Sequence, residues 1–334
     1  MTALAELTLP AGQAATEPPA VRDGVRLLVG DPDGVSHHRF TELPELLRAG
    51  DVLVVNRSGT LPAAVDVDGT DLVVHFSTVR PDGDWLVELR RRDGAATAPY
   101  PGGATGDRLR LAGGATVALR FRYGRLWQVS IDVDSVPGYL MAHGRPIRYG
   151  YVTRDWPLSA YQTVFAVEPG SAEMPSAARP FTTELVTRLV SAGVLFAPIT
   201  LHTGVASLEA PEPPYPERYA VPAVTARLVN QARWAGQRVI AVGTTAVRAI
   251  ETVAAPDGTV HAGAGWTDLV VTPDRGVRAV DGLLTGFHEP RTSHLQLLTA
   301  VAGEPLLARC YAAAVAGAYR WHEFGDLNLL LRTR

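Results

Sequence analysis

A cluster of polar residues follows the apolar run VIAV, where the chain continues as GTTAVRAIE. Gly243 permits a tight turn, and Thr244 and Thr245 stand where a following helix would present unpaired N–H groups and the positive end of its dipole. Arg248 lies one helical turn after Thr244, and Glu251 follows at the i+3 spacing that favours an ion pair. Such a cluster suits a carboxylate or the hydroxyl groups of a sugar. Threonines that cap a helix, beside an ordinary surface ion pair, would give the same pattern.

Two histidines offer proton transfer. His202 ends the apolar run ITL just before Gly204, and His288 follows Asp281 in the stretch VDGLLTGFHEP. Histidine titrates near neutral pH, and a carboxylate can hold its ring in the orientation that a general base needs. We therefore expect His288, oriented by Asp281, as the preferred catalytic base and His202 as the second candidate. The alternative is that His202 is a hydrogen-bonded histidine of the core or its rim and that Asp281 and His288 form an Asp–His pattern by chance.

Alternating helical and strand patterns surround these residues. Helical periodicity predicts helices at TTELVTRLVSAG, AVTARLVNQARWAG and GTTAVRAIETVAA, and short apolar runs predict strands at VRLLV, DVLVV, VLFAPITLH, RVIAV and GWTDLVV. Apolar strands that alternate with helices are typical of an α/β fold with a mainly parallel sheet covered on both faces. Ligands bind such sheets at the carboxyl ends of the strands, where we expect the polar cluster and both histidines to lie.

The chain between about residues 64 and 149 has a different pattern. VALRFRYGRLWQVSIDV alternates apolar and polar residues and turns at Gly124, which predicts a β-hairpin; DLVVHFSTV and DWLVELRRR are typical of two more strands. This portion is therefore expected to form a separate antiparallel β module, a small barrel. Its arginines could form a basic face that holds RNA phosphates, with a solvated sheet face as the simpler alternative. They are Arg90, Arg91, Arg92, Arg108, Arg110, Arg120, Arg122 and Arg125.

The composition excludes several classes of site. The 334 residues include no lysine, which excludes a lysine Schiff base, a lysine general base and a Walker-type phosphate loop. Cys310 is the only cysteine, which excludes an internal disulfide and a thiolate metal cluster. The net charge of −3 gives no global attraction to nucleic acid. No apolar run approaches a membrane span and no signal-peptide pattern opens the chain, so we expect a cytoplasmic protein without membrane contact.

The motifs resemble one family along nearly the whole chain. The matching stretches are VRDGVRLLV, HRFTELPELLRAGDVLVVN, YQTVFA, LHTG, VIAVGTTAVRAIE, GWTDL, VDGLLTGFHEP and YRWHEFGDLNLLL. They resemble the S-adenosylmethionine:tRNA ribosyltransferase-isomerases of queuosine biosynthesis. The resemblance implies a larger α/β domain, barrel-like with a mainly parallel sheet, at residues 1–62 and 150–334. It also implies an antiparallel β-barrel domain inserted at residues 63–149, in agreement with the change of pattern in the middle of the chain.

The resemblance also implies a reaction. The family transfers and isomerises the ribosyl group of S-adenosylmethionine onto the aminomethyl group of a 7-deazaguanine in tRNA, and adenine and methionine depart. The positive sulfonium acidifies the C5′ protons, so that a positioned base could remove one. The site must therefore supply a base near C5′, a proton donor for adenine, and a clamp for the carboxylate and ammonium of methionine. A metal is not expected, and the protein is expected to be a monomer.

Residues in the matching motifs are expected to contact this substrate. Arg248 is the candidate clamp for the carboxylate, and Asp268 or Asp281 could hold the ammonium or the ribose hydroxyls. Tyr161 could offer an aromatic face to the sulfonium. The other expected contact residues, beside Gly243, Thr244 and Thr245, are Gln162, Asn56 and Asp326.

Several positions depart from the family pattern. They are Arg57, Gly59, Ala64, Ala178, Pro180, Ala206, Glu289, Arg291, His294 and Gln296. Such changes alter hydrogen bonding and charge at a pocket, each by about 1–3 kcal/mol if buried. Three interpretations stay open: the family reaction on tRNA, a paralogue whose acceptor is a small molecule such as a free deazapurine, and a non-catalytic relative that binds RNA or S-adenosylmethionine. The departures favour a changed acceptor, and the family reaction is the best single statement of function.

Overall fold

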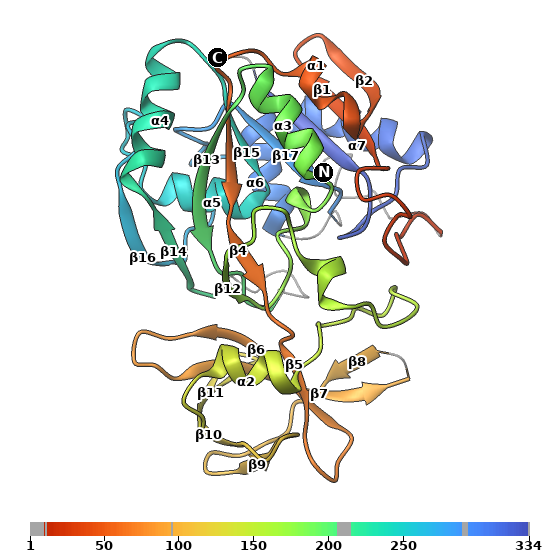
Figure 1. The fold of residues 1–334 in the computed structure, drawn as a ribbon, viewed down its shortest axis with the longest axis vertical. Coiled ribbons are helices and arrows are strands. Elements are labelled where there is room, and N and C mark those ends of the chain that lie inside the picture. Colours follow the sequence, from red (N-terminus) through yellow and green to blue (C-terminus); the bar gives the residue numbers. More distant parts are fainter. Residues whose placement is uncertain (1–9, 11, 95, 206–214, 289–292, 333–334) are drawn as a thin grey trace.

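The described part of the chain forms three sheets and the helices that cover them. The computed structural model describes residues 10, 12–94, 96–205, 215–288 and 293–332. Figure 1 shows a nine-stranded sheet with its helices in the upper part of the view and a seven-stranded sheet below it. The structure is therefore mixed α/β, as expected. Among the described residues, no helix combines the length and the apolar character that a membrane crossing requires.

The nine-stranded sheet is mixed rather than mainly parallel. Its strands are β1 (Arg26–Asp31), β2 (Gly34–Arg39), β3 (Val52–Asn56), β13 (Leu195–Leu201), β14 (Glu217–Val221), β15 (Val239–Val242), β16 (Gly263–Thr267), β17 (Gly282–Gly286) and β18 (Leu327–Leu331). They lie in the order β16-β14-β13-β3-β15-β17-β18-β1-β2. The central run β13-β3-β15-β17 and the pair β18-β1 are parallel, and the remaining pairs are antiparallel. Parallel pairing is thus limited to the central run and to the pair β18–β1. Strand β2 runs antiparallel to β1, β14 runs antiparallel to β13 and β16, and β18 runs antiparallel to β17.

Helices cover both faces of this sheet. One face carries α4 (Ala223–Trp234), α5 (Thr244–Thr252), α6 (Ser293–Ala302) and α7 (Glu304–Ala316), and the other carries η1 (Phe40–Glu42), α1 (Leu43–Leu46), η3 (Ser176–Ala178) and α3 (Thr183–Ser191). A strand that is covered on both faces needs apolar side chains that point alternately to one face and the other, and β3 shows this pattern. Val52 and Val54 pack on the α4–α7 side, whereas Leu53 and Val55 pack on the α1 and α3 side. Apolar residues fill both faces, so the polar side chains gather at the strand ends.

The seven-stranded sheet is antiparallel and has its own hydrophobic core. Its strands are β5 (Ala64–Asp66), β6 (Leu72–Val79), β7 (Trp85–Asp93), β8 (Ala96–Pro99), β9 (Arg108–Arg110), β10 (Thr116–Tyr123) and β11 (Leu126–Ile131). The β10–β11 hairpin turns at Gly124, whose φ of 61° favours glycine, as predicted. The edge strands approach each other where Val67 bridges Leu111. Helix α2 (Val136–His143) packs on the same core through Val136 and Leu140.

A short parallel ribbon connects the two large sheets. Strand β4 (Ser58–Thr60) follows β3 directly and pairs with β12 (Glu168–Ser171). The hydroxyls of Ser58 and Ser171 are 2.6 Å apart in its buried centre. The short helix η2 (Leu158–Tyr161) precedes β12 in the chain. Strand β4 precedes the seven-stranded sheet in the chain, and β12 follows it. The ribbon therefore brings both of these segments to the carboxyl ends of the central parallel strands.

Candidate functional site

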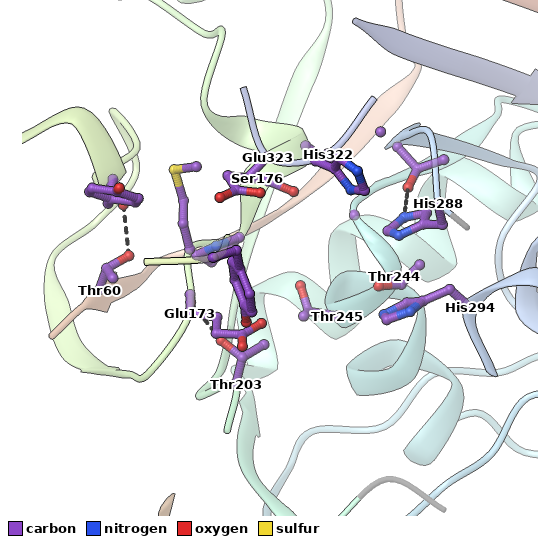
Figure 2. Close-up of a pocket in the computed structure, with 18 of the residues that line it drawn as sticks. Thr60, Glu173, Ser176, Thr203, Thr244, Thr245, His288, His294, His322 and Glu323 are labelled. Carbon is purple, nitrogen blue, oxygen red and sulfur yellow. Dashed lines mark hydrogen bonds between the residues drawn. The ribbon is translucent and has the colours of Figure 1, made fainter. Parts of the chain in front are cut away.

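A cavity of about 310 Å³ lies at the carboxyl ends of β15 and β17, beside the connecting ribbon. This volume falls in the range of about 300–1,000 Å³ that is usual for small-molecule sites. Figure 2 shows Thr245 between Glu173 and Thr203 on one side and His288 and His294 on the other, with Thr244 beside the histidines. The polar and aromatic residues that line the cavity are Thr60, Tyr149, Tyr151, Tyr161, Glu173, Ser176, Thr203, Thr244, Thr245, Thr285, Phe287, His288, His294, His322 and Glu323.

The predicted Gly-Thr-Thr cluster lies in the cavity wall. Gly243 has a φ of 91°, a conformation that favours glycine, and α5 begins immediately after it without a side-chain cap. Neither threonine therefore caps the helix. Thr245 Oγ1 instead accepts a hydrogen bond of 3.3 Å from Asn56 Nδ2. The start of α5 brings the positive end of a helix dipole to the cavity.

Arg248 lies in a second, adjoining cavity of about 120 Å³. Its guanidinium forms an ion pair with Glu217, and its Nε donates a hydrogen bond of 3.1 Å to the Leu269 carbonyl. The two cavities share Glu173, Thr203, Thr244, Thr245 and His294 in their linings. They are therefore neighbouring compartments, and the smaller one is lined by the guanidinium of Arg248 and the carboxylates of Glu173 and Glu217.

The predicted pair of Arg248 and Glu251 is wrong. Glu251 is buried, and its carboxylate bonds Arg275 at 2.9 Å and the backbone N–H of Ala279 at 2.8 Å. These contacts turn Glu251 toward the segment before β17, away from Arg248. Tertiary contacts with a distant segment thus override the local i+3 spacing.

His288 lies in the cavity against a second histidine. Its Nε2 is 3.0 Å from Thr285 Oγ1, and its ring stacks on that of His294 with centroids 4.4 Å apart (Figure 2). Burial, followed by the nearby His294 and His322, holds the pKa of His288 well below its ordinary value. Burial and Arg248 lower the pKa of His294 to about 4. Both rings are therefore neutral near pH 7, and His288 can accept a proton.

Asp281 does not orient His288. It precedes β17, whereas His288 follows the same strand, so a five-residue strand about 16 Å long lies between them. The Asp281 carboxylate accepts a hydrogen bond of 2.9 Å from the backbone N–H of Val239, at the start of β15. The expected Asp–His pair is therefore wrong, because the two residues lie at opposite edges of the sheet.

His202 lies outside the residues that line either cavity. Its Nδ1 is 2.8 Å from Ser58 Oγ, and its Nε2 is 3.5 Å from the Glu168 carboxylate. Burial and the nearby Arg218 lower its pKa, although Glu168 opposes this shift. Gly170 leaves room for the ring, since a Cβ there would come within 2.3 Å of it. These contacts match the alternative interpretation, a hydrogen-bonded histidine that holds strands together.

Tyr161 and Gln162 have different positions. Tyr161 lines the cavity, and burial raises the pKa of its hydroxyl to about 12, so it stays protonated. Gln162 accepts a hydrogen bond of 3.0 Å from the Thr60 N–H and donates one of 2.7 Å to the Thr60 carbonyl. Its amide is therefore used to fix strand β4 and does not line either cavity.

The remaining predicted contact residues lie away from the cavity linings. Asn56 is buried and donates a hydrogen bond of 2.8 Å to the Leu201 carbonyl, so its side chain connects β3 to β13. Asp326 forms an ion pair with Arg26 at 2.8 Å. Asp268 is exposed just after β16. None of the three lines the two cavities.

Residues without a sequence prediction form one wall of the cavity. His322 has a φ of 73°, which is uncommon for a residue with a side chain, and its ring stacks on Tyr151 with centroids 4.1 Å apart. The Tyr151 hydroxyl donates a hydrogen bond of 2.5 Å to Glu323. Burial raises the pKa of Glu323, although this hydrogen bond opposes the shift. The adjacent base and acid in the stretch YRWHEFGD were the signal available in the sequence.

Most arginines of the predicted basic face are paired with carboxylates. Among the described residues the pairs are Arg90 and Arg125 with Glu88, Arg91 with Asp71, Arg92 with Asp66, Arg110 with Asp68, and Arg120 with Asp84. This pairing reduces the positive charge that the sheet presents. No group of three or more histidine, cysteine, aspartate or glutamate side chains in the described segments is placed to hold a metal ion.

The chain is similar to a known family along its length. The family model described as queuosine biosynthesis protein matches residues 5–330. The S-adenosylmethionine:tRNA ribosyltransferase-isomerase of Moorella thermoacetica is 36% identical over 97% of this chain and 97% of the relative. The protein of the same name from Azoarcus sp. is also 36% identical, over 97% of this chain and 95% of the relative. The crystal structure of S-adenosylmethionine tRNA ribosyltransferase from Thermotoga maritima is 28% identical, with a TM-score of 0.57, and the match covers 98% of this chain and 100% of that one. The chain belongs to the queuosine biosynthesis protein family.

Proposed function

We propose that the chain is an S-adenosylmethionine-dependent ribosyltransferase-isomerase that acts on a 7-aminomethyl-7-deazaguanine in tRNA and releases adenine and methionine. The observation that carries the proposal is the cavity that joins the start of α5 to neutral histidines and a half-buried carboxyl group whose pKa is raised. The relatives of the same family, which bear the name of this activity, support it. No metal is part of the proposal.

The two compartments suit the two halves of S-adenosylmethionine. The larger cavity has aromatic walls in Tyr149, Tyr151 and Phe287, which suit a nucleoside and a sulfonium. The smaller cavity holds Arg248 and Glu217, whose opposite charges match the carboxylate and the ammonium of methionine. We therefore place the nucleoside in the larger cavity and the amino-acid end beside Arg248.

Two groups in the larger cavity suit the two proton transfers. His288 is neutral and can accept the C5′ proton, and the electron pair left on carbon is stabilised by the adjacent sulfonium. Burial raises the pKa of Glu323, which favours its protonated form, and this carboxyl is the candidate proton donor to adenine. The C5′ electron pair then forms a C4′–C5′ double bond and opens the ribose ring at the C4′–O4′ bond. The ring oxygen forms a carbonyl at C1′, and the electron pair of the glycosidic bond leaves with the base. His288 is thus the proposed base and Glu323 the proposed acid.

We further propose the domain division and the setting of the protein. Residues 63–149 would form an inserted β-barrel domain, with residues 1–62 and 150–334 as the barrel-like α/β domain around the parallel strands. The seven-stranded sheet with its own core supports this division. A monomer that acts in the cytoplasm, where tRNA is modified, completes the proposal.

A paralogue with a small-molecule acceptor is the second candidate. The departure at His294 favours it, because this residue stacks on the proposed base and lines both compartments. The departures at Ala206, Glu289 and Arg291 lie outside the described residues.

Mass spectrometry of three parallel reactions tests the proposal. Each contains S-adenosylmethionine with unmodified tRNA, with tRNA that carries the aminomethyl deazaguanine, or with the free base. We expect an adduct and free adenine only with the modified tRNA. An adduct on the free base alone would support the paralogue, and binding of S-adenosylmethionine without turnover on any acceptor would indicate a non-catalytic relative.

A further inference from the structure

Two further cavities extend from the proposed active site along the seven-stranded sheet. One of about 190 Å³ shares Ile147, Tyr149 and Glu173 with the main cavity. The other, of about 90 Å³, shares His75, Thr97 and Arg148 with the first. We call these two the arginine cavities, because Arg90, Arg92, Arg145 and Arg148 line them. They form a row that begins beside the proposed nucleoside site.

The outer arginine cavity has more guanidinium than carboxylate charge. Arg92 and Arg145 share a single carboxylate, that of Asp66, at 2.5 and 2.8 Å. Arg148 pairs with Asp155 at 2.9 Å, but the Asp155 side chain is 76% exposed. An exposed ion pair of this kind contributes little free energy, so a competing anion can replace Asp155 at small cost.

The inner arginine cavity repeats this arrangement. Arg90 and Arg125 share the buried carboxylate of Glu88 at 2.8 and 2.7 Å. With Arg125, the second partner of Glu88, five guanidiniums lie at or beside the two cavities, against the four carboxylates of Asp66, Glu88, Asp155 and Glu173. The row therefore carries a net positive charge although each arginine has a partner.

His75 supplies an independent indication that an anion belongs here. It lines both arginine cavities, is 4% exposed, and its ring makes no hydrogen bond to any described residue. Burial lowers the pKa of His75 to about 3, and the charges that add to this effect are those of Arg90, Arg145 and Arg125. The local field is therefore positive, and the neutral ring keeps an N–H donor for a ligand.

We propose that the arginine cavities bind a phosphodiester group of the RNA backbone next to the acceptor base. Neither S-adenosylmethionine nor a free deazapurine carries a phosphate, whereas guanidinium groups and a neutral imidazole suit one. The inference rests on the proposed function, and it favours RNA over a free base as the acceptor. It also places the RNA contact in a recess beside the active site rather than on the open face of the sheet.

Binding of an anticodon stem-loop RNA with the aminomethyl deazaguanine tests the proposal. Fluorescence anisotropy over a salt series would compare wild type with Arg92→Gln and Arg148→Gln. We expect each variant to bind this RNA about tenfold more weakly, with a log–log salt slope shallower by about 0.7 for each lost phosphate contact. The matched control is Arg110→Gln, because Arg110 lies on the same sheet, is 74% exposed and lines neither arginine cavity. Thermal unfolding checks that each variant is folded.

A second arm uses the wild-type protein and a changed RNA. Neutral methylphosphonate linkages on either side of the acceptor nucleotide should weaken wild-type binding by a similar factor and leave Arg148→Gln little affected. This arm distinguishes an RNA phosphodiester from free phosphate, because free phosphate would compete equally with the unmodified and the methylphosphonate RNA. Three results would each overturn the inference. The Arg92 and Arg148 variants could bind as the wild type does, Arg110→Gln could lose as much affinity as they do, or the effects of the protein and RNA changes could be additive. Absence of ribosyl transfer by the wild type would overturn the proposed function alone, since RNA binding is measured separately.

Discussion

The role of Glu323 gives the sharpest prediction. Glu323→Gln keeps the size of the side chain and its hydrogen-bond partner Tyr151 but removes the acidic proton. General acid catalysis contributes about 10²–10⁴-fold to rate, so release of adenine should fall by that factor. This corresponds to about 3–5 kcal/mol of transition-state stabilisation. Binding of S-adenosylmethionine should change little, because the substitution is nearly isosteric.

The pH dependence of the same step has a defined sign. Burial raises the pKa of Glu323, so its neutral, proton-donating form persists above the ordinary range of a carboxyl group. Activity should be full below the raised pKa and fall as the pH rises through it. The hydrogen bond from Tyr151 lowers this pKa. Tyr151→Phe should therefore move the fall of activity to higher pH, while the ring that stacks on His322 is kept.

Single-turnover release of adenine, with saturating substrates over a pH series, measures both effects. The Glu323→Gln profile should lose the limb that falls with rising pH, because no group with this pKa remains. A Tyr151→Phe profile at the wild-type position, or one moved to lower pH, would refute the assignment of this limb to Glu323. A Glu323→Gln enzyme that releases adenine at the wild-type rate would refute the acid role itself.

Three further predictions follow from the site. His288→Gln should slow exchange of the C5′ hydrogens of S-adenosylmethionine with solvent by about 10²–10⁴-fold, measured by deuterium incorporation, and undiminished exchange would exclude it as the base. Asp281→Ala should lower the free energy of unfolding by about 1–3 kcal/mol, because the buried N–H of Val239 loses its acceptor, while adenine release stays at the wild-type rate; a slower reaction in folded protein would contradict this. Gly243→Ala should cost about 1–3 kcal/mol at its φ of 91°, and an unchanged melting temperature would show that this backbone conformation carries no strain.

Local patterns predicted those elements whose causes are local. Helix α3 begins where Thr182 accepts a hydrogen bond from the Leu185 N–H, and the turn after it uses Gly193 with a φ of 84°. The β10–β11 hairpin and the start of α5 at Gly243 are also where their turn residues indicated. The direction in which each strand runs relative to its neighbours could not be predicted from such local patterns. The C-terminal strand β18 pairs antiparallel to β17 and parallel to β1, and no local pattern encodes such a choice.

The predicted site residues divide according to the end of the strand on which they lie. Gly243 and His288 follow parallel strands and line the cavity, and Asp281 precedes one and lies at the opposite edge. His202 follows β13, but its ring contacts Ser58 of β4 and Glu168 of β12 and lines neither cavity. Sequence order thus places a residue at an edge of the sheet, whereas contacts from distant segments decide whether it faces a ligand.

The wall formed by Tyr151, His322 and Glu323 depends entirely on such distant contacts. Tyr151 follows the seven-stranded sheet in the chain, whereas His322 and Glu323 precede β18. Neither segment alone would bury Glu323, and an exposed glutamate would be ionised at neutral pH and unable to donate a proton. The fold raises the pKa of Glu323 through burial by bringing the two segments together. The connection that carries the chain into the smaller sheet and back therefore contributes to the environment of the proposed donor, because it brings Tyr151 to Glu323.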